Sequence, residues 1–271
     1  METLIDNKGV HLDFVNSDRK ILNESQKIKF LVVKYLLGAT GKFRLGFAWV
    51  VLEPLLVSLI YVFLFSVIRS DISGELIIYG IGSYGVFSNS IRAGMDGLSD
   101  SNGGFTAERI STSALLKSQI IYSVIEGCIQ AISILILLYI AMDTQFPGAL
   151  TFIVICPLIA VISRTLGFNL VLFLSRTPDM KHIFNFFLRL GFFVSPVLYP
   201  FDSCEGLHKQ FNELNPVSHI IELSRYLSGA IDNFDVPSHP LQIIVILTTI
   251  LLSFRGVAKL DTYRWEVSTW N

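Results

Sequence analysis

The sequence predicts an all-α membrane protein with six transmembrane helices, and three observations support this fold class. The 271-residue chain is 52% hydrophobic but only 16% charged, whereas soluble domains carry about 25% charged residues. After a polar and basic segment, residues 1–44, most of the chain falls into apolar blocks comparable to the roughly 20 residues that cross a bilayer. These blocks are continuously apolar rather than alternating, which favours helices over a barrel.

The predicted spans follow one another with short connections. They cover Leu45–Ile68, Leu76–Ile91, Ser118–Met142, Gly148–Leu174, Ile183–Leu198 and Leu241–Phe254. The second and fifth are close to the lower length limit of about 17 residues. With the N-terminus in the cytoplasm, sixteen of the 21 Lys and Arg fall on the cytoplasmic side and three on the other. This bias predicts that both termini lie in the cytoplasm, at the inner membrane.

Two segments are predicted to touch the membrane without crossing it. Residues 23–38 repeat apolar side chains at helical spacing among lysines, with Asn23 or Ser25 as a cap and Gly38 as a stop, which predicts an amphipathic helix in the interface. A packing helix of a small soluble domain is the alternative. Residues 199–240 are too polar to cross and too apolar for a plain loop, so we expect a re-entrant hairpin in the outer leaflet. The predicted organisation is therefore a cytoplasmic segment (1–44), a permease domain (45–258) and a cytoplasmic tail (259–271).

The motifs of common enzyme classes are missing from the sequence. "GATGKF" places Phe43 after Gly41-Lys42 and lacks the first glycine and the hydroxyl residue of a phosphate loop. "GIGSYG" lacks the glycine two residues before Ser83 that a nucleophile elbow requires. The five histidines show no HExxH spacing, the three cysteines no CxxC, and the net charge of −1 argues against nucleic acid. We expect no catalytic, cofactor or metal site in this chain.

Ionisable residues inside predicted spans are the candidate functional residues, because charges are costly in a membrane. The candidate polar faces comprise Glu53, Glu126, Gln130, Arg164 and Arg189. In one interpretation, Glu126 pairs with Arg164 or Arg189 and locks helices together. In the other, the polar faces line a conduit through the bundle.

Three motifs give the chain a resemblance to a known family. They are "KFRLGFAWVVLEPLL", "LSRTPDMKHIFNFFLRLGFFVSPVLYP" and "LNPVSHIIELSRYLSG". Their order and spacing resemble those of type-2 ABC transporter permeases that export polysaccharides such as O-antigen, capsule and teichoic acid. The first motif includes Glu53 and Pro54. The motif residues that correspond to the outer hairpin of that family are Ser195, Pro196, Tyr199, Pro200, Asn215, Pro216 and Arg225.

The resemblance implies a half-transporter for a lipid-linked glycan. Two copies of the chain would assemble with two separate ATPase subunits, which would bind the ATP. The loop between the second and third spans, with Phe105, Glu108 and Arg109, would contact the ATPase. It departs from the family pattern at Ser111-Thr112, where the family often has Phe-Pro, which leaves the choice of ATPase open.

Three other functions remain alternatives. The same architecture could export a small lipophilic compound. A membrane-embedded glycosyl or acyl transferase would need an acid or histidine constellation at one membrane face, which the sequence does not offer. A non-transporting scaffold would not need charged span interiors.

Overall fold

The computed structural model describes residues 4–6, 9–11, 23–40, 48–68, 73–99, 111–142, 149–174, 178–235, 237, 239–259 and 262. Apart from a small antiparallel hairpin, β1 (Leu4–Asp6) and β2 (Gly9–His11), the described elements are helical. The hairpin was not predicted from the sequence. The rest agrees with an all-helical chain.

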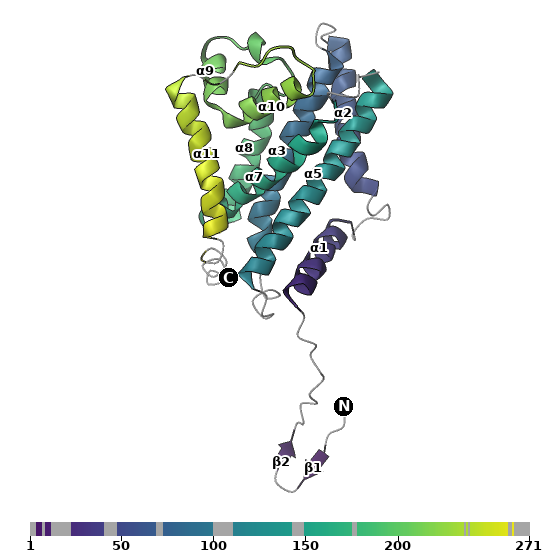
Figure 1. Ribbon diagram of the computed structural model, residues 1–271, viewed down its shortest axis with the longest axis vertical. Coiled ribbons are helices and arrows are strands. Elements are labelled where there is room, and N and C mark those ends of the chain that lie inside the picture. Colours follow the sequence, from purple (N-terminus) through teal and green to yellow (C-terminus); the bar gives the residue numbers. More distant parts are fainter. Residues whose placement is uncertain are drawn as a thin grey trace.

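One helix corresponds to each predicted span, and together these helices form a bundle (Figure 1). They are α2 (Ala48–Ile68), α3 (Gly74–Ser99), α5 (Thr112–Met142), α7 (Phe152–Leu174), α8 (Pro178–Val194) and α11 (Pro240–Ala258). Among the described residues, α5, α7 and α11 contain stretches long and apolar enough to cross a membrane. The helical membrane protein is thereby supported, while the count of six spans stays a prediction.

Several helix ends differ from the predicted spans. The helix α3 continues to Ser99, beyond the predicted end at Ile91, and α5 begins at Thr112 instead of Ser118. Helices continue past their apolar blocks because the backbone hydrogen bonds do not depend on side-chain polarity. The helix α8 begins with Pro178 and ends at Val194, since proline suits the first helical position but interrupts a helix that would run through residues 195–200.

The amphipathic helix α1 (Glu24–Thr40) lies beside the N-terminal part of α5 (Figure 1). Asn23 precedes it, and the backbone N–H of Asn23 donates to the side chain of Gln26. The helix runs through Gly38, so the predicted stop is two residues early. Leu31 is buried, whereas apolar residues such as Leu37 are exposed. An exposed apolar face suits contact with lipid, and a position in the membrane interface stays a prediction.

Two short helices occupy the opposite end of the bundle from α1 (Figure 1). They are α9 (Gly206–Leu214) and α10 (Pro216–Leu227), preceded by the 3-10 turn η1 (Phe201–Ser203). They form the hairpin that was predicted between the last two spans. Whether it enters the membrane remains a prediction.

The centre of the bundle is α3, which packs closely against α7. A side chain at Gly94 would collide with the backbone of Arg164, and one at Gly167 would collide with the backbone of Ile91. Small residues at such contacts let helix backbones approach, as is common in membrane proteins. This close packing fixes the faces of α3 and α7 that border the candidate site.

Candidate functional site

A cavity of about 740 Å³ lies between α2, α3, α5 and α8. Four of the five predicted polar-face residues line it, namely Glu53, Glu126, Gln130 and Arg189. Aromatic side chains complete the wall, among them Tyr61, Tyr84, Tyr122 and Phe192. The structure therefore gathers the polar faces of separate spans around one partly open space between four helices, at which Glu53 and Arg189 are exposed.

Helical periodicity explains why these residues meet. On α5, Tyr122, Glu126 and Gln130 follow one another at intervals of four, which places them on one face. On α3, Tyr84, Ser88 and Arg92 repeat in the same way and face the same cavity. Each helix thus presents a polar stripe to the cavity.

Sequence reasoning missed the part of this wall that α3 provides. Asn89 and Arg92 line the cavity, although the predicted span ends at Ile91 and leaves Arg92 outside it. The available signal was the spacing of Ser88 and Arg92 from Tyr84, which continues one helical stripe past the end of the apolar block.

The fifth predicted polar-face residue, Arg164 on α7, lies behind the cavity wall and is only 2% exposed. Its guanidinium donates to the Gln119 side chain at 2.7 Å and to the Glu126 carboxylate at 2.5 Å. It also lies over the ring of Tyr122, 4.9 Å from the centroid. These three partners share one face of α5, so a single arginine joins α7 to α5.

The ion pair answers the question of which arginine pairs with Glu126. The partner of Glu126 is Arg164, and among the described ion pairs none involves Arg189. Glu126 also lines the cavity. The two interpretations are therefore compatible, because the acid of the pair that joins the helices also lines the cavity.

The amphipathic helix α1 is attached to α5 at two points. Near its start, Glu24 accepts hydrogen bonds from Lys117 at 3.0 Å and from Ser113 at 2.8 Å. The bond from Lys117, together with that from Ser113, lowers the pKa of Glu24. Farther along, the ring of Tyr35 packs 5.6 Å from that of Tyr122. A displacement of α1 would thus act directly on the helix that carries Glu126.

A buried hydrogen bond fixes α8 against α3. The hydroxyl of Tyr84 donates to the carbonyl of Leu188 at 2.5 Å. Gly191 leaves the room that this hydroxyl occupies, since a side chain there would meet it. The bond holds the turn of α8 that carries Arg189 against the cavity.

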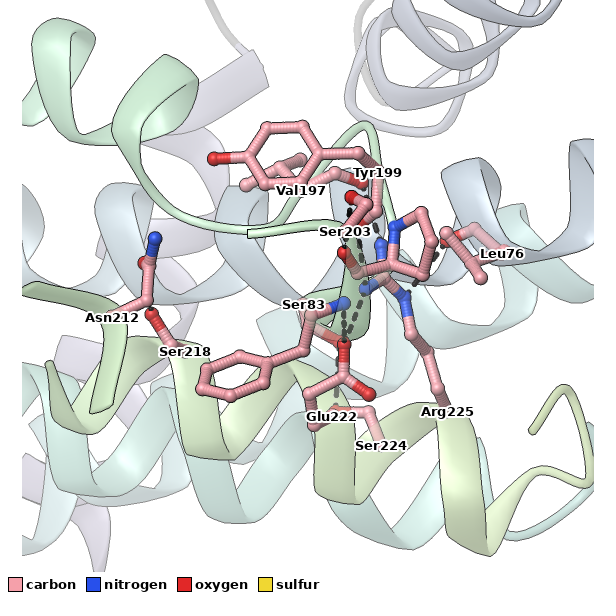
Figure 2. Close-up of polar contacts among 12 residues, drawn as sticks. Leu76, Ser83, Val197, Tyr199, Ser203, Asn212, Ser218, Glu222, Ser224 and Arg225 are labelled. Atoms are coloured by element: carbon pink, nitrogen blue, oxygen red, sulfur yellow. Dashed lines mark hydrogen bonds and ion pairs between the residues drawn. The ribbon is translucent and has the colours of Figure 1, made fainter. Parts of the chain in front are cut away.

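A second polar cluster holds the outer hairpin to the bundle (Figure 2). Arg225 on α10 is fully buried. It donates four hydrogen bonds of 2.8–3.2 Å, to the carbonyls of Leu76, Val197 and Tyr199 and to the carboxylate of Glu222. Burial lowers the pKa of Arg225 to about 10, although Glu222 opposes the shift, so the guanidinium stays charged at neutral pH.

The other hairpin motif residues surround the turn after α8. Asn215 donates to the Ser195 hydroxyl at 2.9 Å and caps α10, with Pro216 in its first turn. The hydroxyl of Tyr199 donates to the carbonyl of Val194 at 2.7 Å. Pro196 is buried in this turn, and Pro200 precedes η1. The predicted motif residues thus converge on one turn, with a structural role in holding the hairpin.

The predicted ATPase-contacting residues Phe105, Glu108 and Arg109 lie outside the described residues. The departure from the family pattern next to them has a visible role, because the Ser111 hydroxyl accepts a hydrogen bond from the backbone N–H of Ala114. This bond caps the start of α5.

Comparisons with known proteins agree with this architecture. Residues 26–228, from α1 to the end of α10, match the family profile of ABC-2 type transporters. The chain is 27% identical over 218 residues to the O-antigen export system permease protein RfbA of Myxococcus xanthus, covering 77% of this chain and 81% of that protein. It is 24% identical over 213 residues to the polysialic acid transport protein KpsM of Escherichia coli, covering 74% of this chain and 81% of that protein. The chain therefore belongs to the ABC-2 type transporter family.

Proposed function

We propose that this chain is the transmembrane subunit of an ABC exporter that moves a lipid-linked polysaccharide or related glycopolymer across the cytoplasmic membrane. The observation that carries the proposal is the partly open cavity between α2, α3, α5 and α8, lined by amide, hydroxyl, charged and aromatic side chains. A few placed polar groups among aromatic rings are typical of ligand sites. The relatives that match most of the chain are named for export of O-antigen and transport of polysialic acid, which favours a glycan.

The proposed topology has six spans with both termini in the cytoplasm. Residues 1–44 precede the permease domain (45–258), whose outer hairpin (199–240) is re-entrant, and the tail (259–271) returns to the cytoplasm. In support, α1 and the C-terminal end of α11 lie at one end of the bundle, while α9 and α10 lie at the other (Figure 1). The concentration of Lys and Arg on the side of α1 supports the same orientation.

The proposed assembly contains two copies of this chain and two ATPase subunits that bind the ATP. In this assembly α1, lying in the interface, receives the motion of the ATPase together with the loop that holds Phe105, Glu108 and Arg109. Its contacts with α5, through Glu24 and Tyr35, give that motion a direct connection to the cavity wall. Evidence for this path would be a measured coupling between α1 and the cavity wall.

The test is reconstitution of the full chain with a candidate ABC ATPase subunit, followed by measurement of glycan movement into proteoliposomes. We expect transport with ATP and none when the partner carries a phosphate-loop substitution that abolishes hydrolysis. Glycan movement that proceeds without nucleotide would contradict the mechanism. Export of a small lipophilic compound but not of glycan would favour the alternative substrate class.

A further inference from the structure

Two arginines in the cavity have no acidic partner among the described residues. Arg92 on α3 and Arg189 on α8 both line the cavity, and neither takes part in a described ion pair. Of the two acids in the lining, Glu126 is already paired with Arg164. Glu53 is left as one negative charge against two positive ones. Charged groups inside a membrane bundle are costly and commonly mark the path of a ligand or ion.

Two donors in the wall of the cavity have no hydrogen-bond partner among the described residues. The hydroxyl of Ser58 on α2 is fully buried and lines the cavity, and the described residues provide no hydrogen-bond partner for it. The Nε of Arg92 is buried and lacks a partner in the same way. A buried donor without an acceptor costs free energy. An acceptor oxygen could reach either donor only after a local movement of the cavity wall, so the accessible parts of the arginines carry the inference.

The surroundings of the cavity indicate an amphiphilic ligand. Its two outer helices, α2 and α8, carry exposed apolar side chains next to the lining residues, such as Ile60 on α2 and Leu190 on α8. A ligand with an apolar tail could lie along these faces while its polar end reaches the arginines. Arginine is the side chain best suited to such an end, because its planar guanidinium binds phosphate oxygens with paired hydrogen bonds.

We propose that the cavity binds the phosphoryl group of a lipid, with Arg92 and Arg189 as its charged ligands. The inference rests on the proposed function, in which this group would be the phosphate that joins a glycan to its lipid. Glu53, the remaining acid, lies in the same lining and reduces the excess charge without cancelling it.

Binding to the purified full chain tests the proposal in an uncharged maltoside detergent, which contains no phosphate. The probe is a short-chain polyprenyl monophosphate, and the matched control ligand is the uncharged polyprenol of the same length. We expect saturable binding of the phosphate alone, weakened about tenfold by either Arg92→Gln or Arg189→Gln through loss of a charged hydrogen bond. Arg189→Lys keeps the charge but loses the paired hydrogen bonds of the guanidinium, so its affinity should lie between those of the parent chain and Arg189→Gln.

Arg255→Gln is the matched control variant, because Arg255 is an exposed arginine on α11 outside the cavity lining. It should bind the probe as the parent chain does. All variants are first compared for thermal unfolding, so that a folding defect is separated from a binding defect.

The outcomes separate the sources of the anion and the competing explanations. Equal binding of phosphatidylglycerol would support the phosphoryl site and identify its source as membrane phospholipid. Equal binding of polyprenol, or unchanged affinity in both arginine variants, would overturn it. Arg189→Gln could also lower the thermal stability, and adding Glu53→Gln could restore it. Such a restoration would indicate an ion pair between Arg189 and Glu53 of a second copy and would also overturn the phosphoryl site.

A failure of the phosphoryl site can be distinguished from a failure of the proposed function. Specific phosphate binding without glycan transport would count against the glycan exporter and leave the phosphoryl site standing. Normal glycan transport together with unchanged probe binding in both variants would leave the exporter standing and remove the site.

Discussion

Replacing Arg225 with Gln should release the outer hairpin from the helical bundle. The guanidinium is fully buried, and glutamine is too short and has too few donors to replace its hydrogen bonds. Its loss leaves the carboxylate of Glu222 without a charge partner while only 13% exposed. The affected carbonyls belong to Leu76, Val197 and Tyr199.

The size of the effect follows from the geometry of this cluster. Removing one partner of a buried ion pair costs about 3–5 kcal/mol. The lower end applies here, because Glu222 retains a hydrogen bond from the backbone N–H of Phe201. A loss of about 3 kcal/mol raises the population of the undocked hairpin by roughly two orders of magnitude.

Cys204 provides a local measurement of undocking. It is 3% exposed and packs beside Asn212 in the hairpin, and burial raises the pKa of its thiol, which keeps it protonated and unreactive. The assay is the rate of alkylation in a background with Cys128→Ser and Cys156→Ser. When closing is fast, the rate follows the open population, so Arg225→Gln should accelerate it about 100-fold.

Two further variants make this measurement decisive. Glu222→Gln should have a smaller effect, because Arg225 retains its three carbonyl partners. Arg255→Gln, on the exposed surface of α11, should leave the rate unchanged. An Arg225→Gln rate within about twofold of the parent rate would refute the reasoning, since such a change is far below the cost of opening a buried ion pair.

Three more perturbations test the bundle and α1. Glu126→Gln should destabilise the chain by about 3–5 kcal/mol, because it leaves Arg164 charged and buried. The charge exchange, in which Glu126→Arg is combined with Arg164→Glu, should recover part of the lost Tm. No recovery of Tm would contradict a structural role of the pair. Gly94→Ala should lower the stability by about 1–3 kcal/mol, because the added methyl group collides with α7. Gly85→Ala should not lower it, because the space beside Gly85 is open. Equal Tm values for the two variants would contradict the close packing of α3 against α7. The lowered pKa of Glu24 means that its contribution to the docking of α1 is present above its unfolded pKa and is lost as the pH falls through its folded value. Hydrogen-exchange protection factors of α1, corrected for the intrinsic exchange rate at each pH, should therefore fall in acid. Glu24→Gln should make these protection factors insensitive to pH in that range.

Much of the helical arrangement was predictable because apolar blocks and helix periodicity are local properties of the sequence. Each predicted span corresponds to a helix, and the polar stripe that contains Glu126 and Gln130 faces a cavity as one interpretation required. The ends were less predictable, since α3 and α5 extend beyond their apolar blocks. That extension brings Arg92 into the cavity wall.

Pairing between helices was the part that sequence could not supply. The predicted spans could not decide whether Glu126 pairs with Arg164 or with Arg189, because the choice depends on which helices are in contact. Close packing at Gly94 and Gly167 brings α3 against α7, while Arg164 on α7 reaches Glu126 on α5. The role of Arg225 was equally hidden, since three of its four partners are backbone carbonyls, which carry no sequence signal.

The most direct test of the account is whether the glycan passes through the cavity. A photo-crosslinking amino acid is placed either at Gln130, which lines the cavity, or at Leu251, which is 66% exposed on α11, and the full transporter is illuminated during ATP-driven export. The account predicts that glycan is captured at position 130 and not at position 251. Capture at position 251 alone, or equal capture at both positions, would contradict the cavity as the path of the substrate.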